Sequence, residues 1–586
     1  MSELIIVKPE KCVGCNACVR ECPAPEANMT KQLEDGRFIT MVNPDKCIAC
    51  GECVKKCNHG ARDFIDDTDD LISDIIKEKI IVMASPAIKM VLPTKWKGVL
   101  DWFKKQGCTI FDASFGADIC TWAHLRTIDQ DKIGNIISQQ CPAIVKYIEI
   151  YQPKLLQNLS PIQSPAACSA IYIKKYLRRN NPIAYISPCI ASKNEAKETG
   201  LYDYNVTIKK LLDYFDRNDI TIPIDTSEEY EYKFDEMQGQ VGAVYSRPGG
   251  LRDNLWLHDP DINITNSEGV HKVYNEMEMY ARMPESKHPK VFDVLSCEFG
   301  CNIGPASGTK QTVFDVMTTS RAIENEAKGR RRSTGIMGRG DDRLFKKFDD
   351  ELRVADFLRN YKPSMPTPVP SIMQLDPIFK KMGMHTEEDR AYDCHACGYD
   401  SCRDMAIAIY RGLNTPDNCI VHAKSVLLAR HSALNRQNEQ LDEITAECLE
   451  LSDKLKDNVA RINENMQNIG ESTAATSERA AVVKDLLENV VTFCNDNSTM
   501  DADSVTQLTS ILETTIDAFS ALDDNVNITN ESSETINKSI NDIISLVGEI
   551  NEVLGKTDNK DEGQKEETKE ENEEAAAEND DAEENE

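Results

Sequence analysis

The sequence predicts a multidomain, mainly α/β protein that ends in a long helical arm, and three observations lead to this prediction. The chain has 586 residues, whereas single hydrophobic cores stop growing at roughly 250–300 residues. Between residues 63 and 370, apolar runs typical of strands alternate with helical patterns. From residue 432 to 554 there is no proline, and apolar residues recur at helical spacing.

The composition narrows the class of protein. Twenty-one cysteines would suggest disulfides in a secreted chain, but the start MSELIIVKPEKC has no signal-peptide apolar core. No apolar run approaches the ~20 residues that cross a bilayer. The net charge of −31 argues against a nucleic-acid partner, because a phosphate backbone needs a basic surface. We therefore expect a cytoplasmic protein without a membrane span, whose cysteines bind metal.

Residues 1–62 carry eight cysteines in two identical C-x2-C-x2-C-x3-C runs, 35 residues apart. In a two-cluster ferredoxin, three cysteines of such a run bind one 4Fe-4S cubane and the fourth reaches the other cubane. One cluster is therefore expected on Cys12, Cys15, Cys18 and Cys57, and the second on Cys22, Cys47, Cys50 and Cys53. Asn58 stands where a proline is usual. Zinc is the alternative, but structural zinc sites usually carry two C-x2-4-C pairs.

Residues 63–370 form the predicted α/β domain. Its expected strands include residues 80–83 and 183–186, and residues 206–215 are an expected helix. Isolated cysteines lie in short loops that read QCP, SPC and SCEFGCNIGP. Each alone fits a buried core cysteine, but four such cysteines after a two-cluster ferredoxin could close a further 4Fe-4S site.

These segments resemble the three signatures of the iron-only (FeFe) hydrogenases. SQQCP, SPCIASKNE and SCEFGCNIGP occur in the family's order, and MASPAIK, FGAD, SPIQSPAACSA and GAVYSRPGGL support the match over roughly residues 1–310. The resemblance implies a cubane joined to a two-iron centre with CO, CN and dithiolate ligands. It implies ligation by Cys141, Cys189, Cys297 and Cys301, with Cys301 as the bridge. It also implies cofactor contacts from Pro86 and Ala87.

Departures from the family pattern concern proton transfer. In fast hydrogenases a cysteine before the first ligand relays protons, but here that residue is Gln140, and an amide does not titrate. Glu195 matches the family's second-motif glutamate, while ICTWAHLRT carries none of the expected carboxylates. The lysine that contacts a cyanide is replaced by Ser192, with Lys193 displaced by one residue.

Other replacements lie near the same segments. Ser187 and Leu295 stand where methionines are usual in the family. Cys120 and Cys168 are either substitute proton relays or core cysteines, and core packing is the favoured interpretation. The pattern fits the sensory branches of the family better than the catalytic ones.

A third cysteine group lies in residues 375–431, after a proline-rich linker at residues 363–370. Cys394, Cys397, Cys402 and Cys419 have the spacing C-x2-C-x4-C-x16-C, which resembles small 4Fe-4S domains of Rnf-type electron-transfer subunits and corrinoid proteins. A 4Fe-4S cluster is expected, with zinc as the alternative. Its position suggests that electrons can leave the two-iron site toward the C-terminus as well as the N-terminus.

Residues 432–554 are the expected arm, and its polar heptads weakly resemble the helical rods of chemotaxis receptors. Such an arm joins subunits, contacts a signalling partner or is purely structural. Cys448 and Cys494 are expected to fill its apolar face. Residues 555–586 are expected to be disordered, because from residue 556 onward 15 acidic and 4 basic residues leave almost nothing to bury.

The leading functional hypothesis is a hydrogen sensor that binds and slowly, reversibly oxidises dihydrogen. The expected redox signal passes through the 4Fe-4S clusters to the arm. A ferredoxin-type electron carrier, a downstream signalling protein and a homodimeric state are the expected partnerships. The alternatives are a ferredoxin-dependent catalytic hydrogenase and an iron–sulfur electron-transfer or assembly protein without the two-iron unit.

Overall fold

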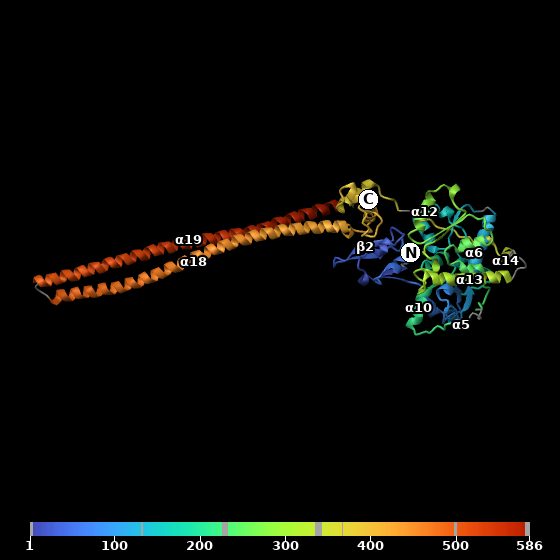
Figure 1. Cartoon of the computed structure of the whole chain (residues 1–586), viewed down its shortest axis with the longest axis horizontal. Helices are drawn as coiled ribbons and strands as arrows, with labels where there is room; N and C mark the ends of the chain where they lie inside the picture. The colour runs from blue at the N-terminus through green and yellow to red at the C-terminus, as the bar shows by residue number, and fades with distance from the viewer. Residues whose placement is uncertain are drawn as a thin grey trace. The chain divides into compact units, whose positions relative to one another are not determined.

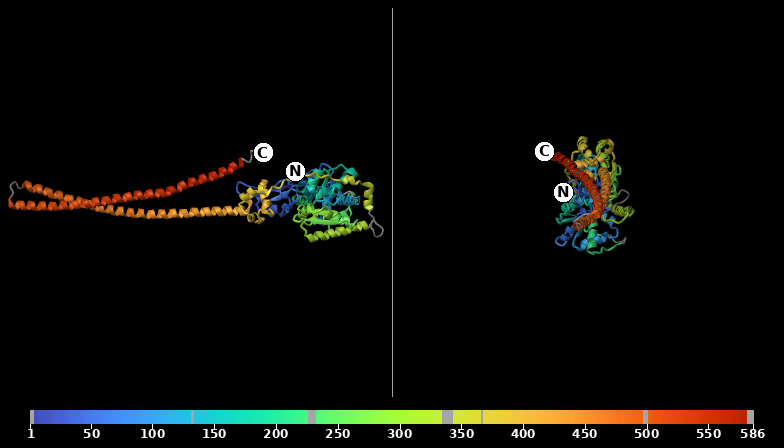
Figure 2. Two further views of the ribbon diagram at one scale, coloured as in Figure 1. Left: turned by 90° about the horizontal axis from the view of Figure 1, so that it is seen from above. Right: turned by 90° about the vertical axis from the view of Figure 1, so that its left-hand side faces the viewer.

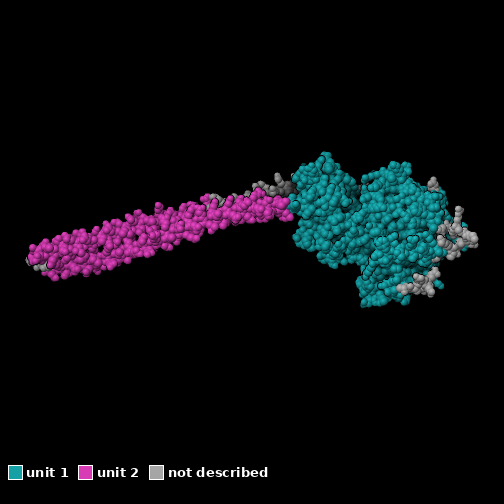
Figure 3. Space-filling view, in the orientation of Figure 1, with its two compact units in different colours: residues 1–426 teal, residues 427–586 magenta. Residues whose placement is uncertain are grey.

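The computed structural model describes residues 4–130, 133–225, 232–333, 343–365, 367–496 and 501–580. The chain divides into two compact units, Met1–Val426 and Leu427–Glu586 (Figure 3). Each unit is described by itself. Among the described helices, none combines the length and the apolar character that crossing a membrane requires.

The first unit begins with a small α+β module. Two antiparallel pairs, β1 with β4 and β2 with β3, accompany two short helices that lie within the cysteine runs. The elements are β1 Ile5–Val7, α1 Ala17–Arg20, β2 Asn28–Gln32, β3 Phe38–Val42, α2 Glu52–Lys56 and β4 Arg62–Phe64. This is the ferredoxin-like arrangement predicted from the cysteine spacing.

The central part is built on two parallel sheets, as expected for an α/β domain. The larger has the order β6-β5-β8-β9 and the smaller the order β10-β11-β7. The strands are β5 Ile81–Ala84, β6 Thr109–Asp112, β7 Ile136–Ile137, β8 Ile183–Ser187, β9 Tyr204–Thr207, β10 Ile264–Glu268 and β11 Val291–Leu295. β5 and β11 are buried along their whole length, because helices cover both faces of such sheets.

Helices connect and cover these strands (Figure 1). They are α3 Thr68–Asp74, α4 Ala87–Val91, α5 Trp96–Lys105, α6 Ser114–Asp129, α7 Pro142–Tyr151, α8 Pro165–Ile171, α9 Ser192–Thr199, α10 Ile208–Arg217, α11 Gly250–Trp256, α12 Val273–Arg282, α13 Val313–Ser333 and α14 Arg343–Glu351. The helix expected from residue 206 starts two residues later. Thr207 ends β9, and its hydroxyl then accepts the Lys210 N–H as the cap of α10.

The last part of the first unit holds the third cysteine group. α15 Ile372–Lys381, α16 Glu387–Arg390 and α17 Cys402–Tyr410 precede Cys419. The linker residues 363–365 and 367–370 have no regular secondary structure, as the prolines predict.

Three regions expected as separate domains pack into one unit. Buried residues of the ferredoxin-like module, including Ile5, Ile48 and Phe64, share a core with Ile144 and Ile148 of α7. Val19 of α1 belongs to a second core formed mainly by residues 375–419. Because apolar cores are continuous across these regions, segments that the sequence predicts as separate domains belong to one compact unit.

The second unit is a helical hairpin of α18 (Ile420–Asp496), from Leu427 onward, and α19 (Ala502–Asp580). The helices run antiparallel (Figure 1). Ser472 of α18 donates to the Asn525 carbonyl of α19 (2.7 Å), whereas Arg479, later in α18, donates to the carbonyl of Ala521, which comes earlier in α19. Both helices curve gently along their length (Figure 2), as long helices usually do.

The acidic end differs from its expectation. The backbone of α19 continues as helix from residue 555 to 580, where composition predicts disorder. This stretch is rich in Glu, Lys and Ala, all strong helix formers. Low hydrophobicity therefore argues against a packed core there but not against a helix. Residues 581–586, the end of the expected tail, and the side chain of Cys494 lie outside the described part.

Candidate metal centres

Cys22, Cys47, Cys50 and Cys53 line one cavity of about 330 Å³ in the ferredoxin-like module. This is the second predicted ligand set, brought together from two runs of the sequence. Burial raises the pKa of the Cys22 thiol to about 12, and it raises the pKa of the other three thiols as well. Binding of a cluster therefore has to displace protons from these thiols.

In the first predicted set, Cys18 lies against Arg62. Among its four cysteines, Cys15 is exposed and the others are partly buried. The buried Arg62 guanidinium donates to Cys18 Sγ (3.2 Å), Asn28 Oδ1 (3.1 Å) and the Thr40 carbonyl (2.9 Å). A fixed positive charge here favours thiolates and a negatively charged cluster.

The central cavity, about 900 Å³ including its open part, collects the hydrogenase-type residues. All four predicted ligands, Cys141, Cys189, Cys297 and Cys301, line it. Pro86, Gln140, Ser192, Glu195 and Leu295 line it too, as does Tyr245 of the GAVYSRPGGL segment. Cys50 lies on its wall as well, so the second ferredoxin cavity and the central cavity share a residue.

The fold explains this convergence. The cysteine loops leave the carboxyl ends of parallel strands, where open α/β sheets bind ligands. Cys189 follows β8, Cys297 follows β11, and Cys141 follows β7 as the residue that caps α7. Pro142 occupies the first turn of α7, where its missing N–H costs nothing.

Glycines permit the close loop packing. At Gly51, with φ of +80°, an added Cβ would lie 2.5 Å from Ile190 Cδ1 and 3.0 Å from Pro305 Cβ. Ile190 follows the predicted ligand Cys189, and Pro305 lies on the central cavity wall. Only a residue without a side chain lets the Cys50 loop approach the central site this closely.

Gln140 is held by a carboxylate that the motif analysis missed. Its Nε2 donates to Asp293 Oδ1 at 2.5 Å, while its own buried Oε1 has no hydrogen-bond partner in the described structure. Asp293 also accepts from the Arg252 backbone N–H and the Ser138 hydroxyl. Burial raises the pKa of Asp293 to about 6 despite these bonds. The sequence signal was an acid within the apolar strand VFDVL.

Glu195 is fully buried and engaged on all sides. Its carboxylate lies 3.0 Å from Arg359 Nη1 and accepts from Ser164 Oγ (2.9 Å) and Tyr202 OH (3.1 Å). Burial raises the pKa of Glu195, and the attraction of Arg359 opposes this shift without cancelling it. Arg359 lies beyond the segments that carry the family resemblance, so no motif pointed to it.

Three expected neighbours of the cofactor do not line the cavity. The Lys193 ammonium forms an ion pair with Asp67 Oδ1 at 2.9 Å, and its predicted role beside Ser192 stays a prediction. Ala87 is buried as the first residue of α4, behind Pro86. Ser187 donates to Asn205 Oδ1. In each case a local partner or the start of a helix fixes the side chain elsewhere.

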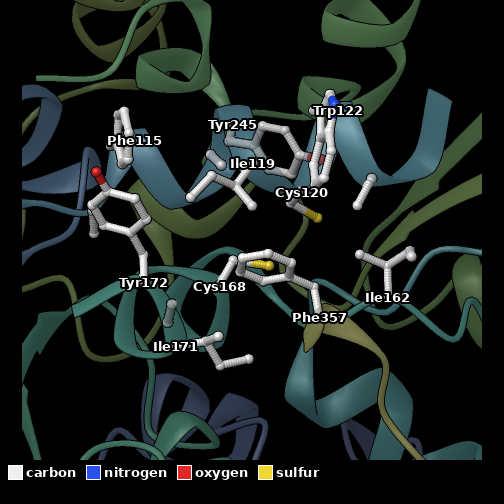
Figure 4. Packing of buried hydrophobic residues seen from close by; sticks show 14 of the residues in the cluster. Phe115, Ile119, Cys120, Trp122, Ile162, Cys168, Ile171, Tyr172, Tyr245 and Phe357 are labelled. Carbon is white, nitrogen blue, oxygen red and sulfur yellow. The ribbon is translucent and has the colours of Figure 1, made fainter. Parts of the chain in front are cut away.

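Cys120 and Cys168 both lie in the apolar core (Figure 4), as favoured from the sequence. Both thiols donate to the Gln163 carbonyl at 3.4 Å. Cys120 Sγ also lies 3.7 Å from His124 Nδ1. Burial alone would raise the pKa of Cys120, but the Cys168 hydrogen bond and the nearby His124 together lower it.

The third cysteine group lines a further cavity of about 310 Å³. Cys394, Cys397, Cys402 and Cys419 all face it, as the spacing predicts. Among the described residues, however, no three or more histidine, cysteine or acidic side chains are gathered tightly enough for a single metal ion.

This third group packs against the ferredoxin-like module. Asn16 Nδ2 donates to Asn418 Oδ1 (3.2 Å), Arg411 pairs with Glu26 (2.9 Å), and the Thr30 N–H donates to the Leu413 carbonyl (2.8 Å). The expectation that electrons can leave a two-iron site toward the C-terminus as well as the N-terminus stays a prediction.

Comparison with known families agrees with these sites. Residues 78–258 match the family model for the iron only hydrogenase large subunit, C-terminal domain. Residues 11–61 match a 4Fe-4S dicluster domain, and residues 391–421 match an Fe-S cluster domain.

Individual relatives are more distant. The periplasmic Fe hydrogenase large subunit of Nitratidesulfovibrio vulgaris is 28% identical over 276 residues, covering 42% of this chain and 60% of that subunit. Solved structures of FeFe hydrogenases, among them variants of HydA1 from Chlamydomonas reinhardtii, are matched over 100% of their length and 52% of this chain. Their sequence identity is 13–14% and their TM-score 0.37–0.39.

Proposed function

We propose that this protein, a relative of the FeFe hydrogenases, is a hydrogen sensor. Residues 78–258 match the iron-only hydrogenase large-subunit domain and residues 11–61 match a 4Fe-4S dicluster domain, which supports the proposal. The protein binds dihydrogen and oxidises it slowly and reversibly. The resulting redox signal passes along 4Fe-4S clusters to a helical arm that a partner protein reads.

The central cavity fits the family's cofactor. Four cysteines line one cavity, thiolates are the ligands that iron–sulfur clusters take, and the unpartnered Oε1 of Gln140 leaves a polar atom for a ligand. Cys141, Cys189, Cys297 and Cys301 would hold this group, with Cys301 as the bridge. When bound, it would supply the chemistry that interconverts dihydrogen with two protons and two electrons.

The observation that carries the proposal is Gln140. A neutral amide occupies the position where a proton relay is needed, and its hydrogen bond to Asp293 fixes its orientation. Relays must gain and lose a proton near the working pH, which an amide does not do. Glu195 is bound to Arg359 and Ser164. Slow proton delivery suits a protein that needs to register hydrogen but not to turn it over rapidly.

The order of the cysteine cavities favours one electron path. Cys50 connects the central cavity to the second ferredoxin site, Arg62 lies against the first site, and the Cys394 group packs beyond it. Each cysteine set would hold one 4Fe-4S cluster. A ferredoxin-type carrier would exchange electrons with these clusters and set the resting state of the sensor.

The signal would reach the arm at Cys419. This predicted ligand directly precedes Ile420, the first residue of the 77-residue helix α18. Reduction of a cluster there would add negative charge beside a helix N-terminus, which carries partial positive charge. The stability of the first turn of α18 would thus depend on the redox state of the neighbouring cluster.

The setting of the protein follows from the same chemistry. We propose that it works in the cytoplasm, where clustered thiols stay reduced, and that it acts as a homodimer through its arm.

A catalytic hydrogenase is the second candidate, and Asp293 favours it. Its pKa of about 6 and its contact with Gln140 would allow a rerouted proton path. The rate of hydrogen evolution distinguishes the sensor from the catalytic hydrogenase.

The test uses the fully matured chain. Infrared spectroscopy should show CO and CN bands that shift reversibly when hydrogen replaces argon, with low hydrogen evolution from a reduced donor. Cys301→Ala should lose these bands while the other clusters remain. High turnover would instead establish the catalytic candidate. Absence of CO and CN bands would make the chain a hydrogenase-like electron-transfer or assembly protein.

A further inference from the structure

The helical hairpin has an apolar side that its own two helices leave uncovered. In α19, residues facing α18 follow heptad positions a and d, which include Thr515, Asn525, Ile536 and Ser539, all buried. A second stripe runs along position e. Its large apolar members are exposed by 41–50%: Val505, Leu512, Phe519, Val526, Ile540 and Val547.

This stripe is specific to one side. Position e of α19 holds six large apolar residues and Ser533 between residues 505 and 547. Position g, on the other side of the seam, is mostly polar, with Ile528 as its large apolar residue. The position g residues are Gln507, Thr514, Ala521, Ile528, Thr535, Asp542 and Glu549. A helix that packs against a single neighbour needs only its a and d stripe.

The partner helix extends the same surface. In an antiparallel hairpin, the e positions of both helices lie on one side of the seam. Position e of α18 presents Val459, Met466 and Leu487, which are exposed as well. A groove lined by Ala480, Leu487 and Val491 hollows this side of α18, with the Lys484–Glu488 ion pair beside it.

Charge also distinguishes the two sides. Acidic residues of α19 concentrate at positions c and f: Asp503, Glu513, Asp517, Asp524, Glu531, Glu534 and Glu552. Positions b and e, among residues 448–491 and 505–551 that the structure describes, carry Lys456, Lys484 and Asp523. The apolar side is thus the part of an acidic hairpin where another acidic hairpin meets little repulsion.

We propose that this side, defined by the e and b positions of α18 and α19 and here called the e-face, binds the e-face of a second copy of this chain. The two hairpins would form a four-helix bundle about a two-fold axis. A self-complementary surface of equal length and matching heptads on both partners is what such symmetry requires. A different protein would need the same uninterrupted heptad pattern.

The area is sufficient for a stable contact. Ile516 and Ile544, at position b, border the stripe and are each more than 60% exposed. Eight large apolar side chains on α19 alone, each about half exposed, offer on the order of 600 Å² per copy, and α18 brings this near the ~800 Å² that each partner contributes to a standard interface. An exposed patch of this size on a hairpin signals an interaction site.

The experiment measures oligomeric state in the full, matured chain by sedimentation equilibrium. The wild-type protein should be a dimer at micromolar concentration. Leu512→Glu combined with Phe519→Glu should raise the dimer dissociation constant by about 100-fold or more, because each change buries a charge twice across the two-fold axis. Ile528→Glu is the matched control: its side chain is 49% exposed on the same helix but off the e-face, and dimerisation should persist.

Circular dichroism and iron content serve as controls for folding and cluster assembly. Each variant should retain the helicity and the iron content of the wild-type chain. Co-expression of tagged and untagged copies supplies an independent measurement, in which the tagged wild-type chain should retain its untagged copy. A monomeric wild-type chain, or a dimer broken by Ile528→Glu and not by the e-face pair, would overturn the proposal.

Discussion

Gln140 occupies the position of the predicted proton relay with a side chain that does not titrate. Its amide lines the central cavity, and its Nε2 donates to Asp293, while its Oε1 has no hydrogen-bond partner in the described structure. A residue of this kind preserves the shape of the site and removes its acid–base chemistry.

Gln140→Cys should therefore increase hydrogen evolution. A thiol titrates, and a well-positioned acid or base contributes typically 10²–10⁴-fold; because Glu195 remains bound to Arg359, we expect about tenfold. Hydrogen evolution from a reduced donor measures the effect. Gln140→Ser is the control, because serine is similar in size to cysteine but its hydroxyl does not titrate near the working pH. An equal gain in both variants would show that space, not proton transfer, limits the rate.

Asp293 should titrate near pH 6 in the folded protein. Burial raises its pKa from 3.8 to about 6, so between these values the folded state holds a proton that the unfolded state has lost. Stability should fall as the pH rises through this interval, by about 3 kcal/mol in total, and level off above it. The infrared carbonyl band of the protonated acid, identified by its loss in Asp293→Asn, should have its midpoint near pH 6. A midpoint near pH 4 would contradict the role of burial.

At the scale of elements, the sequence predicts what depends on neighbours along the chain. Cluster ligands occur in short runs whose spacing is itself the signal, so the cavities could be assigned to cysteines before any coordinates. The heptads of the arm are equally local. Contacts between Gln140 and Asp293, 153 residues apart, or Glu195 and Arg359, 164 residues apart, leave no such pattern.

The docking of whole elements was hidden for the same reason. Asn16 and Asn418 form a hydrogen bond although they are 402 residues apart, and no pattern in either segment predicts this contact. The ion pair between Lys193 and Asp67 is likewise a contact between distant segments that no motif predicts.

Gly398 tests that docking. Its φ is +90°, and an added Cβ would lie 2.8 Å from both the Asn16 carbonyl oxygen and Val19 Cβ. Gly398→Ala should shift the Cys394 group away from the ferredoxin-like module, at a cost of about 1–3 kcal/mol, and slow its reduction under hydrogen. Electron paramagnetic resonance can follow that reduction, while the infrared response of the central site should stay unchanged.

Gly412→Ala is the matched control for this substitution. Gly412 also has a positive φ, +67°, but an added Cβ there meets nothing within 4 Å. It reproduces the backbone strain without the collision. Equal reduction rates in Gly398→Ala and the wild type would contradict an electron path through the ferredoxin-like module.

At the scale of the whole molecule, the predicted ligand cysteines all belong to one of the two compact units. All sixteen predicted ligand cysteines lie between residues 12 and 419, within the unit Met1–Val426. The arm contributes neither ligands nor a wall of the central cavity. Ile420 and Val421, the first residues of α18, line the cavity of the last cysteine group, so the start of this helix is part of the predicted cluster site.

A chain ending at residue 431 should therefore sense hydrogen normally but lose its assembly. It keeps Ile420, Val421 and the first turns of α18, so each site stays complete. Iron content should remain that of the full chain, about 18 atoms if four cubanes and one two-iron centre are present, and the infrared response to hydrogen should be unchanged. Sedimentation should show a monomer, because the e-face is gone, whereas a chain ending at residue 554 should remain a dimer. Loss of the hydrogen response on truncation at residue 431 would mean that the arm acts on the central site and does not simply receive its signal.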